Sequence, residues 1–127
     1  MKTQITLLTL LAAVTLLSVG CQTAVISPGT KTTGIYRLGK LTSTIPGNIA
    51  TSYKAAEAAM QELGLSVIQR VKDQLEARII ARDAQDNKIV VSLISVTDET
   101  TKLTINIGSL SKARRIYQAV LDNMPKT

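Results

Sequence analysis

The chain of 127 residues contains no histidine, no tryptophan and no phenylalanine, and it has one cysteine and three tyrosines. The absence of histidine removes the side chain most often used for proton transfer near neutral pH and a frequent metal ligand. We therefore expect no enzymatic activity, no catalytic residue, no cofactor and no metal site. Single-stranded nucleic acids are commonly bound by several stacked aromatic rings, so the shortage of aromatics also argues against a nucleic-acid partner.

The carboxylates add little toward catalysis or metal binding. Glu57 and Glu62 fall on the polar side of an expected helix, where we expect them to be solvated. The segment DAQDNK, residues 83–88, lacks the regularly spaced oxygen ligands and the turn glycine of a calcium loop. We interpret this segment as a hairpin turn.

The N-terminal segment has the pattern of an export signal. Lys2 is followed by the uncharged run ITLLTLLAAVTLL, residues 5–17, and then by small residues up to Gly20. An apolar run of about 7–15 residues after a basic start is typical of a signal peptide, whereas a permanent membrane-spanning helix needs about 20. We therefore predict a signal peptide over residues 1–20.

The lone cysteine follows this signal directly. The sequence Leu17-Ser18-Val19-Gly20-Cys21 resembles the recognition site of bacterial lipoprotein signal peptidase, although Ser18 stands where leucine is more usual. The resemblance implies cleavage between Gly20 and Cys21, diacylglycerol on the Cys21 thiol and, often, an acyl group such as palmitate on the new amine. The alternative is an ordinary unpaired thiol beside a secretory cleavage site. Lipidation would make the membrane a partner of the chain.

The residue after the cysteine bears on which membrane holds the protein. Gln22 occupies the position where an aspartate would resemble an inner-membrane retention signal. Its presence favours the inner leaflet of the outer membrane, facing the periplasm. The turn-forming segment that follows leads us to expect a lipidated N-terminus and flexible tether over residues 21–33, and a single folded domain over residues 34–127.

Two stretches have the apolar spacing of amphipathic helices. The first begins after Asn48, a good N-cap, and ends before Gly64, a natural helix stop. The second is SLSKARRIYQAVLDNM, with Ser109 or Ser111 as its cap. Each helix has one apolar stripe, which must cover another element.

Four runs of alternating apolar residues predict strands within residues 65–71, 75–81, 89–94 and 103–107. An earlier strand, in one piece or two, is expected over residues 34–45, with a bulge or tight bend at Gly39. The expected cross-strand pairs are Val71 with Leu75, Arg70 with Glu76, Ala81 with Ile89, and Leu93 with Ile105. These registers place the odd-numbered apolar residues of the four later strands on one face.

The expected fold class is α+β, a two-layer sandwich in which two helices pack on one face of an antiparallel sheet. The order is β-α-β-β-β-β-α, and the first strand is expected to pair with the last. From YRLGKL through ELGL and KDQLEARIIARDAQDNKIVV to INIGS, the chain resembles a family of small bacterial lipoproteins known as domain of unknown function three-five-six-eight. That family has no established activity to carry over. The element order is also similar to the helix-grip arrangement of domains of the lipoprotein BamC.

These features favour a lipid-anchored envelope lipoprotein that acts as a periplasm-facing binding or scaffold module, with an envelope protein as partner. The candidate interaction patch is formed by residues expected on the uncovered sheet face: Ile68, Ile80, Val90, Arg70, Arg78 and Arg82. The alternative is that these β-branched residues are present because they favour the strand conformation, and that the face has no binding role. An alternative function is carriage of a small apolar ligand in a helix–sheet groove, where Ala77, Ala81 and Ala113 could leave space.

Overall fold

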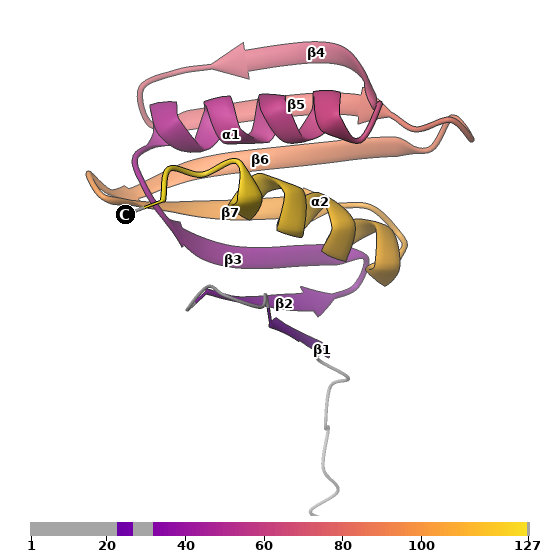
Figure 1. The fold of residues 1–127 in the computed structure, drawn as a ribbon, viewed down its shortest axis with the longest axis horizontal. Coiled ribbons are helices and arrows are strands. Elements are labelled where there is room, and N and C mark those ends of the chain that lie inside the picture. Colours follow the sequence, from indigo (N-terminus) through magenta and orange to yellow (C-terminus); the bar gives the residue numbers. More distant parts are fainter. Residues whose placement is uncertain (1–22, 27–31, 127) are drawn as a thin grey trace, which may run out of the picture.

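The computed structural model describes residues 23–26 and 32–126 (Figure 1). Its elements are β1 Thr23–Ile26, β2 Thr33–Arg37, β3 Lys40–Pro46, α1 Ile49–Glu62, β4 Ser66–Lys72, β5 Glu76–Arg82, β6 Lys88–Thr97, β7 Thr100–Asn106 and α2 Leu110–Asp122. The strands form one seven-stranded antiparallel sheet in the order β1-β2-β3-β7-β6-β5-β4. Both helices pack on the same face of this sheet (Figure 1). The expected α+β class is therefore confirmed.

The N-terminal part of the sheet contains more strands than expected. The strand predicted over residues 34–45 is the hairpin of β2 and β3, which turns tightly at Leu38 and Gly39 with φ angles of 51° and 76°. Within the predicted tether, Thr23–Ile26 forms β1, which pairs with β2. The element order is therefore β-β-β-α-β-β-β-β-α. The first predicted strand is in two pieces, β2 and β3, and β1 was not predicted. The expected pairing of the first predicted strand with the last is confirmed, because β3 lies against β7.

Local capping chemistry explains where both helices begin and end. The Asn48 side-chain oxygen accepts a hydrogen bond from the Thr51 backbone N–H at 2.8 Å, which caps the start of α1. After α1, Gly64 has a φ of 66°. The Leu65 N–H then reaches back to the Met60 carbonyl at 3.0 Å, which closes the helix end. Of the two serines considered for α2, Ser109 is the cap and accepts from the Lys112 N–H.

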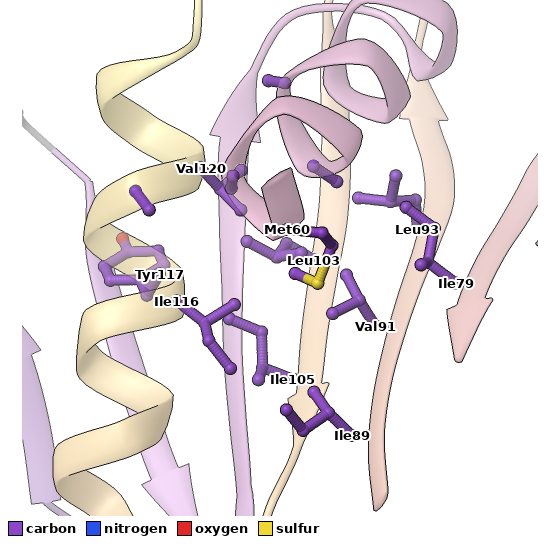
Figure 2. Packing of buried hydrophobic residues seen from close by; sticks show 14 of the residues in the cluster. Met60, Ile79, Ile89, Val91, Leu93, Leu103, Ile105, Ile116, Tyr117 and Val120 are labelled. Atoms are coloured by element: carbon purple, nitrogen blue, oxygen red, sulfur yellow. The ribbon is translucent and has the colours of Figure 1, made fainter. Parts of the chain in front are cut away.

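The core lies between the sheet and the two helices. The odd-numbered apolar residues of β5, β6 and β7 point toward the helices and are fully or almost fully buried, as expected: Ala77, Ile79, Ala81, Ile89, Val91, Leu93, Leu103 and Ile105. Leu41 and Ile45 of β3 extend this layer. Met60 of α1 and Tyr117 and Val120 of α2 pack against this layer from the helix side (Figure 2).

One polar pair is enclosed in this apolar layer. The hydroxyls of Ser43 on β3 and Tyr117 on α2 are 2.9 Å apart, and Ser43 Oγ donates to the Thr33 carbonyl at 3.1 Å. The pair satisfies the Tyr117 hydroxyl, which would otherwise lose its hydrogen bonds to water on burial. It also joins α2 to the two strands β2 and β3.

The strand registers agree with the sequence in one hairpin and differ in two. Ala81 faces Ile89 as predicted. Leu93 faces Leu103 instead of Ile105, a shift of two residues that keeps the same side chains on the covered face. The β4–β5 pairs were wrong, because Val71 pairs with Arg78, three residues farther along the chain than the predicted Leu75. One residue of this difference is the register shift between Val67 and Gln69, which leaves Ile68 as an extra residue. The rest lies in the connection, where Lys72 pairs with Ala77.

The bulge at Ile68 changes which face each later residue of β4 occupies. Arg70 pairs with Ile79 and Val71 pairs with Arg78, so Val71 points away from the helices. Leu75, which was expected in the apolar face, is 70% exposed in the connection to β5. One additional residue in an edge strand has therefore turned Val71 toward solvent.

Candidate functional site

The predicted lipidation and cleavage residues, Gly20 and Cys21, lie outside the described residues. The described chain begins at Thr23, so the edge strand β1 starts two positions after Cys21. In the part of the chain that the structure describes, no helix is long and apolar enough to cross a membrane.

The sheet face opposite the helices, here called the outer face, holds most of the predicted interaction patch. Ile80 of β5 and Val90 of β6 are direct cross-strand partners on this face, and both are half-buried. Arg78 and Arg82 follow on the same side of β5, because residues two apart in a strand share a face. The structure therefore brings these four predicted residues together.

Arg70 departs from the predicted patch. After the bulge, Arg70 points to the helix-covered side, where its Nε lies 3.0 Å from a carboxylate oxygen of Glu57 on α1. Lys72 follows it on that side, with its ammonium 5.4 Å from the ring centre of Tyr53. Burial, aided by a hydrogen bond to Glu57, raises the pKa of the Tyr53 hydroxyl. Arg70 thus joins the sheet edge to α1 and contributes nothing to the centre of the outer face.

Ile68 occupies the bulge itself, beside the Gln69 that pairs with Ile80. Its side chain is well exposed, as is that of Val71 farther along β4. Val71 was missed by the sequence reasoning, because unbroken alternation places it in the core.

A hollow of about 240 Å³ lies on the outer face between β4 and β5. Its lining combines apolar, polar and charged side chains, among them Gln69, Val71, Asp73, Glu76, Arg78 and Ile80. The twist of an antiparallel sheet and the bulge in β4 both curve this corner. The predicted residues Ile80 and Arg78 therefore line a concave surface.

Positive charge predominates on the outer face. Register places Lys102 beside Ile94, and Lys40 beside Asn106 in the same row as Val90. Glu76 is 3.7 Å from Arg78, and Asp86 is 3.6 Å from Arg82. Among the described residues, Lys40 and Lys102 form no ion pair. Lys102 was recognisable from sequence as an outward position of its strand, whereas the place of Lys40 required the β2–β3 turn to be known.

A second hollow, of about 250 Å³, opens where α1 ends and α2 begins. Its mixed lining includes Leu65, Ile107 and Ile116 together with Asp83, Lys112 and Arg115. It does not form at the alanines that were considered as a ligand space. Ala77, Ala81 and Ala113 are all fully buried, so they bring the helices and sheet into close contact.

Asp83 is the most perturbed acid at the rim of this second hollow. The Lys112 ammonium donates to Asp83 Oδ2 at 2.8 Å, and the Asn87 side chain and backbone N–H also donate to this carboxylate. These hydrogen bonds hold the pKa of the Asp83 carboxyl well below its usual range, and the bond from Lys112 has the largest effect. Asp83 also accepts from the Gln85 N–H, so the segment is a hydrogen-bonded hairpin turn as interpreted from sequence.

The carboxylates on α1 serve separate contacts. Glu57 binds Arg70, and Glu62 accepts a hydrogen bond from Asn123 at 2.8 Å. Within residues 23–26 and 32–126, no group of three histidine, cysteine, aspartate or glutamate side chains is placed to hold a metal ion.

The fold defines the class of this protein as a small α+β domain in which an open antiparallel sheet carries two helices on one face and exposes the other. A family model described as "Protein of unknown function (DUF3568)" matches residues 4–123. The chain belongs to this family, so the family assignment made from its sequence motifs is confirmed. No curated protein matches the chain.

Proposed function

We propose that the protein is a lipid-anchored envelope lipoprotein without enzymatic activity, and that its outer sheet face binds an acidic surface of an envelope protein. Retention at the outer membrane, facing the periplasm, is part of this proposal and rests on Gln22 after Cys21. The observation that carries the binding function is the concave corner of the outer face, which Val71, Arg78 and Ile80 line. Val90, the cross-strand partner of Ile80, and Arg82 continue the outer face beside it.

The composition of this corner matches what protein interfaces use. Fully buried centres of interfaces are apolar and are enriched in arginine relative to other surfaces. The carboxylates of Asp73 and Glu76 also line the hollow, and Glu76 lies 3.7 Å from Arg78, so they belong to the polar rim of the proposed surface. Ile80 and Val90 supply the apolar centre, while the arginines supply planar donors that bind carboxylates in pairs. Excess positive charge on the same face would steer an acidic partner toward it.

The binding test compares two charged substitutions in otherwise unchanged full-length protein. Ile80→Glu places a carboxylate in the apolar centre, so we expect a cross-linked envelope partner to be lost while the melting temperature changes little. Val96→Glu is the matched control, because Val96 is exposed on β6 and lies outside the corner. Arg78→Glu should weaken the same partner by charge repulsion. Retention of the partner by both corner variants would refute the proposed surface.

The anchor requires its own test. Intact mass of the membrane-extracted protein should show loss of residues 1–20 and addition of diacylglycerol and acyl groups at Cys21. Radiolabelled palmitate should enter the wild-type chain and be absent from Cys21→Ser. An unlabelled wild-type chain that fractionates as freely soluble material would exclude the lipoprotein assignment.

The hollow between the helix ends bears on the alternative function, carriage of a small apolar ligand. Its volume is slightly below the range of about 300–1,000 Å³ common for ligand pockets, and charged Asp83, Lys112 and Arg115 share its lining with the apolar residues. These features favour the binding module over an apolar carrier. Native mass spectrometry of the purified protein that revealed a stoichiometric lipid would reverse this preference.

A further inference from the structure

The turn between β2 and β3 presents an apolar side chain where turns usually have none. Leu38 is 89% exposed and has a φ of +51°. Asparagine, aspartate and glycine are favoured in such left-handed positions, and they are also the usual residues of two-residue hairpin turns. Leucine at this position therefore gains nothing from the core and is conformationally unfavourable.

Two cations flank this leucine. Arg37 and Lys40 are the paired residues that close the hairpin, and both side chains are exposed. In the part of the chain that the structure describes, neither forms an ion pair. An exposed leucine between two free cations is the arrangement by which surface segments contact anionic lipid: the apolar side chain enters the interface and the cations meet the headgroups.

The turn is held rigidly in its outward position. The Ile107 backbone N–H donates to the Gly39 carbonyl at 3.0 Å, and the Tyr36 hydroxyl donates to the Ile107 carbonyl at 3.4 Å. The turn is therefore braced against the connection between β7 and α2. The turn lies at one end of the sheet (Figure 1). The fold sets its position there, and Leu38 in the turn is exposed to whatever lies beyond this end.

The same end of the sheet is where the chain leaves toward the predicted anchor. Thr23 pairs with Tyr36, two positions before Leu38. Cys21 lies two residues before Thr23, and a chain of that length spans at most about 7 Å. A lipid on Cys21 would thus hold the turn close to the membrane surface, with no long tether between them.

We propose that the β2–β3 turn, with Leu38 between Arg37 and Lys40, is a second membrane contact that binds anionic phospholipid beside the lipidated N-terminus. This inference rests on the lipid anchor of the proposed function. One point of attachment leaves a domain free to rotate, whereas a lipid and a rigid turn together set its orientation. The opposite end of the sheet, with Leu75 in the β4–β5 connection, then faces away from the membrane.

The single cysteine of the chain makes a depth measurement practical, because diacylglycerol on Cys21 would consume its thiol. Leu38→Cys and the matched control Leu75→Cys then each carry one free thiol, at exposed leucines at opposite ends of the sheet. The full-length protein is expressed with its signal, purified in lipidated form and labelled with an environment-sensitive fluorophore. It is then reconstituted into vesicles of phosphatidylglycerol and phosphatidylcholine that contain a lipid-bound quencher.

We expect strong quenching at position 38 and little at position 75, with unchanged melting temperatures in both labelled proteins. Replacing Arg37 and Lys40 by glutamine, or using phosphatidylcholine alone, should reduce quenching at position 38. The loss should correspond to about a fivefold weaker surface association for each cation removed. High salt should act in the same direction.

Equal, weak quenching at the two positions in lipidated protein would overturn the inference while leaving the anchor intact. Cross-linking of position 38 to a protein in native envelopes, without quenching by lipid, would also overturn it and would identify a protein contact. Intact mass distinguishes the two proposals, because an unmodified Cys21 contradicts the lipoprotein assignment. Quenching at position 38 in such unmodified protein would still support the turn as a lipid contact.

Discussion

Ile79 and Ile80 are adjacent residues of the same type in β5, yet they lie in opposite environments. Ile79 is completely buried under α1, whereas Ile80 is half-buried on the face that no described element covers. Val91 and Val90 repeat the contrast on β6. Residue type alone therefore does not separate a side chain that holds the fold together from one that is available to a partner. The separation comes from the strand register and from the position of the helices.

The largest expected effect is the difference between alanine substitutions at these two isoleucines. Ile79→Ala should lower the free energy of unfolding by about 2–5 kcal/mol, because it leaves a cavity in a closely packed layer. Ile80→Ala should lower it by less than about 1 kcal/mol, since its side chain already contacts water. Urea denaturation followed by circular dichroism measures both. Equal losses would show that something else covers the outer face.

A smaller loss of stability is expected from substitutions at the buried pair of hydroxyls, Ser43 and Tyr117. Tyr117→Phe removes the hydroxyl that contacts Ser43, so we expect a loss of about 1–2 kcal/mol in the free energy of unfolding. Ser43→Ala should cost a similar amount, and the double variant should cost less than the sum because the two hydroxyls share one bond. Additive losses in the double-mutant cycle would contradict this coupling.

The smallest effect on stability is expected at the rim of the hollow between the helix ends, where the ion pair of Asp83 and Lys112 is in contact with solvent. The folded-state pKa of Asp83 is below its ordinary value of 3.8, so the folded state binds fewer protons than the unfolded chain around that pH. The stabilisation is therefore fully present above about pH 5 and is lost as the pH falls below 3.8. Asp83→Asn should melt at a lower temperature than wild type near neutral pH.

The pH profile and salt dependence make this last prediction specific. The difference in melting temperature between wild type and Asp83→Asn should shrink on acidification and also at high salt, because the ion pair is accessible to water. Asp86→Asn, in the same turn but bound to Arg82, is the matched control. A difference that persisted unchanged at low pH would exclude Asp83 ionisation as its source.

The sequence predicted the fold best where one physical signal acts alone. The caps Asn48 and Ser109 and the helix stop at Gly64 are local hydrogen-bonding and backbone effects, and the structure has all three. The pair of Ala81 and Ile89 followed from a short polar turn between two alternating runs. The family resemblance rested on these same structural motifs.

The misses share a different cause, because each depends on tertiary context. The bulge at Ile68 leaves no mark in the alternation, so Val71 and Arg70 were assigned to the wrong sides of the sheet. β1 is a short strand among turn-forming residues, and it forms against β2. Five of the six proposed patch residues lie at or beside the outer face, the exception being Arg70.

The extra residue at position 68 has an effect on how neighbouring copies of this domain behave. In the described sheet, β4 is an outermost strand, with hydrogen-bonding groups left over on one side. Such a strand can recruit a strand from another molecule, and bulges and nearby charges are known deterrents. The irregularity at Ile68 interrupts the repeat that an incoming chain would have to match, and Arg70 and Lys72 beyond it add positive charge. If the lipid proposed for Cys21 concentrates the domain on a membrane surface, this protection against polymerisation becomes more important.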